Sequence, residues 1–103
     1  MEEITKVLAL YEKHGWKISR VLLSSENGSQ QYSEIFGGAP VVNSEFDAVW
    51  FSRKRQDGRT AWEIRLLSTT PYALCESFPD DSSKEFVEAE KRNMENRLAE
   101  KAS

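Results

Sequence analysis

The chain has 103 residues, of which 39% are hydrophobic and 30% are charged, and its net charge is −3. This length predicts a single domain, residues 1–103, and this composition excludes an intrinsically disordered chain. The net negative charge argues against bulk attraction to nucleic-acid phosphates, and no apolar run is long enough to cross a membrane.

Cysteine usage limits the chemistry further. Cys75 is the only cysteine, which excludes an intrachain disulfide and leaves a cysteine-based zinc site without ligands. The N-terminus carries no apolar run of the signal-peptide type. We therefore expect a soluble, cytoplasmic protein with no membrane association.

The N-terminal part predicts a helix followed by a strand. In residues 3–13, apolar side chains recur along one helical face, and a basic last turn followed by Gly15 marks the end of the helix. Residues 16–24 alternate at first and become apolar on both faces toward their end. This pattern predicts a strand that occupies a central position in a sheet.

Residues 25–45 carry the weakest pattern. We predict a short helix at Gln30–Phe36, with Ser29 as its N-cap and Gly37 as its stop signal. The following "APVV" favours a short edge strand, because Pro40 lacks the N–H that a central strand needs.

Residues 46–68 predict a β-hairpin, because two alternating runs flank Asp57-Gly58. A two-residue type I′ turn at this dipeptide places Trp50 opposite Arg65. In that register Trp50 lies on a half-exposed face, with Ser52, Lys54, Glu63 and Arg65. The opposite face is then the core face, and it carries Val49, Phe51, Trp62, Ile64 and Leu66.

The C-terminal part predicts a strand and a long helix. Residues 71–78 read as a strand that is entered through Pro71. Ser82 and Glu85 have the spacing of a capping box, so the helix begins there and runs to about residue 100. Its apolar stripe is narrow and consists mainly of Val87, Met94 and Leu98.

Together these elements predict an α+β fold. The expected order is α-β-(short α)-β-β-β-α, with an antiparallel sheet of about four strands. We expect both terminal helices to pack on one apolar face of this sheet, which gives a two-layer sandwich.

The sequence contains few candidate catalytic residues. His14 is the only histidine, and we interpret it as a residue at the C-terminal end of a helix, where it interacts favourably with the helix dipole. We interpret Cys75 as a small buried residue. Gly37-Gly38 lacks the spacing of a phosphate-binding loop, and no metal-binding motif is present. We therefore predict no catalytic residue, no cofactor and no metal, and we do not expect an enzyme.

The basic hairpin is the one candidate for contact with a partner. Its basic side chains and a neighbouring tryptophan could meet a partner protein or nucleic acid. They could also be structural, because a Trp–Arg pair stabilises a sheet surface and basic residues discourage edge pairing. We favour the structural interpretation. The candidate contact residues are Trp50, Arg53, Lys54, Arg55, Arg59 and Arg65.

Three functions follow in order of preference. The first is a small non-enzymatic domain that acts through protein–protein contacts, including contact with a second copy in a homodimer. The second is a nucleic-acid-binding module that uses hairpin residues 50–65. The third is a small-ligand or catalytic pocket, lined by Trp16, Tyr32, Phe36 or Tyr72.

Overall fold

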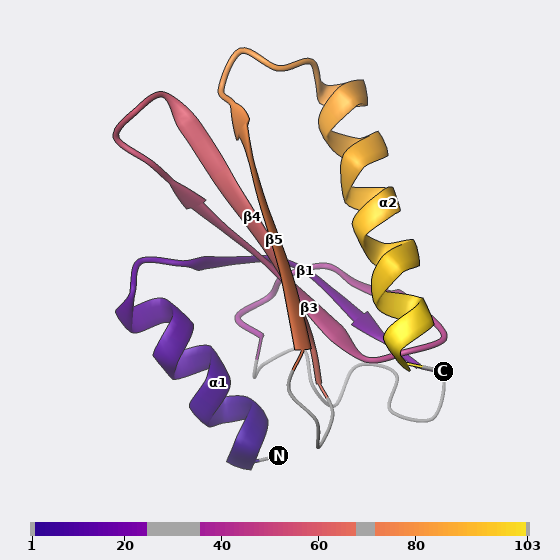
Figure 1. The fold of residues 1–103 in the computed structure, drawn as a ribbon. Coiled ribbons are helices and arrows are strands. Elements are labelled where there is room, and N and C mark those ends of the chain that lie inside the picture. Colours follow the sequence, from indigo (N-terminus) through magenta and orange to yellow (C-terminus); the bar gives the residue numbers. More distant parts are fainter. Residues whose placement is uncertain (1, 25–35, 68–71, 103) are drawn as a thin grey trace.

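The computed structural model describes residues 2–24, 36–67 and 72–102. It confirms the α+β class, because one helix precedes and one helix follows a mostly antiparallel sheet (Figure 1). The helices are α1 (Glu2–Lys13) and α2 (Lys84–Ala102). The strands are β1 (Lys17–Leu23), β2 (Val41–Asn43), β3 (Ala48–Lys54), β4 (Arg59–Leu66) and β5 (Tyr72–Pro79).

The described strands form one five-stranded sheet in the order β2-β1-β3-β4-β5. β2 runs parallel to β1, and every other neighbouring pair is antiparallel. The internal place of β1 confirms its predicted central position. β2 is the predicted short edge strand, and Pro40 before it accepts a 2.8 Å hydrogen bond from Val21 N–H. The short helix predicted at Gln30–Phe36 lies outside the described residues, apart from Phe36.

The layering differs from the expected two-layer sandwich. α1 packs on one face of the sheet and α2 packs on the opposite face, so the sheet lies between two helical layers (Figure 1). The reason is that β3 is apolar on both faces. Val49 and Phe51 point toward α1, whereas Ala48 and Trp50 point toward α2.

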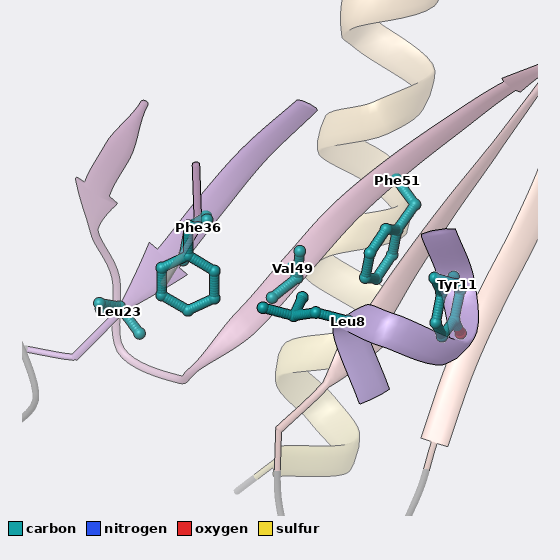
Figure 2. Close-up of a cluster of buried hydrophobic side chains, with 7 residues drawn as sticks. Leu8, Tyr11, Leu23, Phe36, Val49 and Phe51 are labelled. Carbon is teal, nitrogen blue, oxygen red and sulfur yellow. The ribbon is translucent and has the colours of Figure 1, made fainter. Parts of the chain in front are cut away.

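The α1-side core joins α1 to β1 and β3 (Figure 2). The Tyr11 ring stacks on Phe51, with 3.9 Å between ring centroids and 11° between planes. Gly15 has a φ of 88°, a left-handed conformation that glycine adopts at low cost, and it ends α1 as predicted. The buried members are Leu8, Tyr11, Val21, Leu23, Phe36, Val49 and Phe51.

The α2-side core joins the last helix to the middle of the sheet. Met94 and Leu98 are buried, which confirms the narrow apolar stripe. The cap is one residue later than predicted, because Ser83 Oγ, and not Ser82, accepts a 3.1 Å hydrogen bond from Phe86 N–H. The buried members are Leu22, Ala48, Trp50, Ile64, Leu66, Met94 and Leu98.

The hairpin register is shifted by one residue from the predicted one. Trp50 lies opposite Ile64, not opposite Arg65. Arg55 N–H donates a 2.8 Å hydrogen bond to Arg59 O, so the loop has three residues rather than two. Gly58 has a φ of 79°, which suits the left-handed position of a three-residue loop.

This shift also corrects the predicted division of the two faces. Val49 and Phe51 share the α1 side, but Trp62, Ile64 and Leu66 lie on the α2 side with Trp50. A one-residue change of register moves every side chain of one strand to the other face, which is the physical reason for the difference.

Candidate functional site

Trp50 is a core residue rather than a half-exposed one. None of its surface is exposed (0%). Its indole Nε1 donates a 2.7 Å hydrogen bond to Glu95 Oε2 in α2, and its ring meets Trp62 edge to face at 6.5 Å. The predicted pair with Arg65 is absent because Arg65 lies on the other face. Trp50 therefore offers no surface to a partner and instead fastens α2 to the sheet.

Lys91 is a buried cation that no sequence pattern predicts. Its Nζ lies 5.0 Å from the Trp50 ring centroid and 4.2 Å from that of Trp62. Glu88 Oε1 is 3.8 Å away, and Glu88 also approaches Arg20 in β1 at 3.7 Å. Burial lowers the pKa of Lys91 below its ordinary value. Two indole faces and a carboxylate thus hold this cation between α2 and the sheet.

The basic residues of the hairpin divide by face and by exposure. Arg53, Lys54 and Arg55 are exposed, whereas Arg59 and Arg65 are half-buried. The strand register puts the four arginines on the α1 side of the sheet, and Lys54 lies on the other side. The structure thus brings four of the six predicted contact residues onto one face.

Several of these side chains already have partners within the chain. Arg59 Nη2 donates a 2.7 Å hydrogen bond to Ser77 O, and its Nε donates to Ser77 Oγ at 3.2 Å. Arg55 Nη2 lies 2.9 Å from Asp57 Oδ2. These contacts favour the structural interpretation for Arg55 and Arg59.

Acidic groups flank the same end of the sheet. Asp80 N–H donates a 2.8 Å hydrogen bond to Gly58 O, which ties the end of β5 to the hairpin loop. Asp80 Oδ1 accepts a 2.6 Å hydrogen bond from Thr60 Oγ1. Asp80 and the exposed Asp81 therefore offset part of the positive charge at the tip.

A polar cluster lies where α1 meets the inner part of β4. The Tyr11 hydroxyl donates a hydrogen bond to Glu63, and the Arg65 guanidinium lies 5.9 Å from the Tyr11 ring centroid. Burial, together with the hydrogen bond to Glu63, raises the pKa of Tyr11 to about 12. The phenol therefore stays protonated at neutral pH and serves as a hydrogen-bond donor.

Cys75 lies beside this cluster and is exposed, so the interpretation as a buried residue is wrong. It stands opposite Glu63 in the β4–β5 pair, on the part of the α1 side over β4 and β5. Desolvation and the Glu63 carboxylate raise the pKa of the Cys75 thiol. A protonated thiol is a poor nucleophile, so this arrangement favours no thiolate chemistry.

The other candidate chemical groups are separated in space. His14 follows α1 with an exposed side chain. Among residues 2–24, 36–67 and 72–102, no group of three or more His, Cys, Asp or Glu is arranged to hold a metal ion. The aromatic residues of the third hypothesis do not converge: Trp16 and Phe36 belong to the α1-side core and Tyr72 to the α2-side core, while Tyr32 lies outside the described residues.

The two edges of the sheet differ sharply. β2 has three residues and pairs only with Val21–Leu23, so among the described strands the residues Lys17–Arg20 of β1 form the rest of this edge and carry two basic side chains. β5 has eight residues, and among the described strands it pairs only with β4. Glu76 is its only charged residue, and Ala73, Cys75 and Glu76 are exposed. The sequence pattern predicts this strand but not its edge position, because a strand with one charge in eight residues is more typical of the interior of a sheet.

One side of α2 lies above the β5 edge and is here named the outer margin. Phe86 meets Phe78 edge to face at 5.6 Å near one end of β5. Lys101 Nζ lies 5.4 Å from the Tyr72 ring centroid at the other end. α2 therefore runs antiparallel to β5. By helical spacing, the outer margin consists of Phe86, Glu90, Asn93, Arg97 and Lys101.

Comparison of the chain with protein-family models, with curated proteins and with solved structures finds no match in any of the three. Neither described helix is long and apolar enough to cross a membrane.

Proposed function

We propose that this domain acts through protein–protein contacts, and that it makes them by accepting an extended strand at the β5 edge. An edge strand presents a row of N–H and C=O groups that a partner strand can pair. The observation that carries the proposal is the contrast between the two edges. β2 is a three-residue edge, whereas β5 is an eight-residue edge with one charged side chain.

The surroundings of β5 support this role. Exposed Phe86, with 48% of its surface accessible, lies next to Phe78 and extends the apolar surface at one end of the edge. Natural sheets usually protect long edges with lysine, proline or bulges. β5 has only Pro79 at its very end, and no other described strand pairs with its outer side. Ser77 O accepts a 2.7 Å hydrogen bond from Arg59 Nη2 but keeps a second acceptor lone pair for a partner strand.

The proposal is tested by blocking the edge. We expect Ala73→Lys/Cys75→Lys to abolish complex formation, because both side chains are exposed and edge lysines oppose strand pairing. The matched control is Val42→Lys/Asn43→Lys at the β2 edge, which should bind as the wild type does. Complexes are compared by affinity capture on the immobilised chain and by light scattering. Equal binding by the two variants would refute the role of the β5 edge.

We also propose a cytoplasmic location. The support is the exposed free thiol of Cys75, since a reducing compartment keeps such a thiol unpaired. The state of this thiol in the intact cell, read by alkylation before lysis, is the test; complete oxidation in the cell would contradict the location.

Nucleic-acid binding through the hairpin is the second candidate. It is favoured by four arginines on one face and by Arg53, whose guanidinium lies 5.9 Å from the centroid of the half-buried Trp16 ring. This function predicts a salt-sensitive affinity that falls in Arg53→Ala/Arg55→Ala. Binding that is absent at low salt, or unchanged in the double variant, would exclude it.

A further inference from the structure

We infer that the strand accepted at the β5 edge is β5 of a second copy of this chain, so that two domains form one continuous sheet around a twofold axis. This inference rests on the proposed function and names the partner. It commits to an antiparallel β5–β5 pair centred on Cys75, with the two α2 helices side by side on one face. The charge order along α2 supports the second copy, and the composition of β5 selects the register of the pair.

The register follows from the pleat. Residues that face each other in an antiparallel pair point to the same side of the sheet, so a twofold axis normal to the sheet passes through a residue position. A centre at Glu76 would oppose two carboxylates, which is unfavourable. A centre at Leu74 would pair only residues 72–76 within β5. A centre at Cys75 pairs residues 72–78 and places Tyr72 opposite Phe78 of the second copy.

The outer margin of α2 is complementary to itself. The twofold axis reverses the second helix, so Glu90 meets Arg97 of the other copy, and each pair occurs twice. Phe86 meets the aliphatic stem of Lys101 in the same way. Arg97 is exposed, and Glu90 is half-buried beside Asn93 Nδ2, at 3.4 Å. Opposite charges at symmetric positions of an antiparallel helix pair favour a second copy over an unrelated strand.

The spacing is compatible with this pairing. α2 lies over β4 and β5 and contacts both strands. Because neighbouring strands are about 4.8 Å apart, a helix centred between β4 and β5 lies about 5 Å from the proposed axis, and one centred over β4 lies about 7 Å from it. The two helices are then about 10–14 Å apart, a distance that long side chains such as those of Glu90 and Arg97 span.

Charge reversal on the outer margin tests the helix contact. We expect sedimentation to give twice the 11.8 kDa chain mass for the wild type. Glu90→Lys and Arg97→Glu should each weaken the dimer at least tenfold, because each places like charges across the axis. The double variant Glu90→Lys/Arg97→Glu should restore it. An equal mixture of the two single variants should form a heterodimer, because both of its cross-axis pairs are again opposite in charge.

Cysteine cross-linking tests the register. Opposed residues in an antiparallel pair have Cα atoms about 4.5–5.5 Å apart, within reach of a disulfide. Mild oxidation should therefore link Cys75 to Cys75. In a Cys75→Ser background, Ala73→Cys and Ser77→Cys chains should cross-link when mixed. Each alone should remain unlinked, because identical positions are then about 13 Å apart along the strands.

The outcomes separate the inference from the proposed function. A strict monomer at about 0.1 mM overturns the second copy. This geometry is wrong if neither charge reversal weakens the dimer. It is also wrong if the Ala73→Cys chain or the Ser77→Cys chain cross-links to a second copy of itself. If the monomer still binds other proteins and Ala73→Lys/Cys75→Lys abolishes that binding, the proposed function stands and only the inference falls.

Discussion

The buried hydroxyl of Tyr11 makes the stability of the fold depend on alkaline pH. The pKa of Tyr11 is raised from 10.0 to about 12 in the folded chain, chiefly by burial and then by the hydrogen bond to Glu63. The folded state therefore holds the phenolic proton more tightly than the unfolded state does. The contribution of the protonated Tyr11 hydroxyl to the free energy of unfolding is fully present below pH 10 and is lost as the pH rises from 10 to 12.

The magnitude follows from the size of this shift. Two pKa units correspond to about 2.7 kcal/mol of unfolding free energy, of which about 1.4 kcal/mol is lost by pH 11. Tyr11→Phe keeps the stacked ring on Phe51 but removes the ionisable group. The free-energy gap between wild type and Tyr11→Phe should therefore shrink by about 1.4 kcal/mol between pH 8 and pH 11.

The assay is urea unfolding followed by tryptophan fluorescence at several pH values. Using the gap between two chains cancels the titration of all other groups. Glu63→Gln serves as a second variant, because it keeps the burial of Tyr11 and removes the carboxylate, so its pH dependence should lie between the other two. Parallel loss of stability by wild type and Tyr11→Phe up to pH 11 would refute the reasoning.

Three further changes give separate expectations. Lys91→Met removes a cation whose pKa is lowered by burial. The unfolding free energy of the wild type, measured relative to this variant, should therefore rise as the pH increases from 8 toward 10.5, the ordinary pKa of lysine. A difference that stays constant with pH in urea titrations would contradict this. Gly58→Ala should cost about 1–2 kcal/mol, because a Cβ at φ 79° is strained, although among the described residues beyond its chain neighbours no atom lies within 4 Å to clash with it. A melting temperature equal to that of wild type would exclude this strain. Leu98→Ala should lower the free energy of unfolding by about 2–5 kcal/mol, because it leaves a cavity between α2 and the sheet. The control Asn96→Ala, at an exposed position of the same helix, should change it by less than about 0.5 kcal/mol. Chemical unfolding compares the two variants, and equal effects would show that Leu98 does not hold α2 on the sheet.

The sequence predicts the elements well because their signals are local. The apolar spacing of α1, Gly15 at its end and Pro40 before β2 each fix a feature within a few residues. The register of the hairpin depends on loop length, and Asp57-Gly58 is compatible with both a two-residue and a three-residue loop. That single ambiguity moved Trp50 from the core to the surface in the prediction.

The layering and the candidate site were harder to predict for a related reason. β3 is apolar on both faces, which is a signal for two covering layers, but the side on which each terminal helix packs depends on connections far apart in the chain. The place of β5 at the edge depends on strand order, which periodicity does not encode. Lys91 shows the same limit, because a lysine between two tryptophans is visible only after the sheet and α2 are assembled.

The division of the core between two faces has a consequence for the order in which the chain can fold. Every member of the α1-side core lies at or before Leu67, so this half is complete in sequence before α2 has been synthesised. The α2-side core needs Met94 and Leu98. The three tryptophans report the two halves separately, since Trp16 belongs to the first, whereas Trp50 and Trp62 belong to the second. On a ribosome, the indoles of Trp50 and Trp62 would stay in water until the last helix emerges.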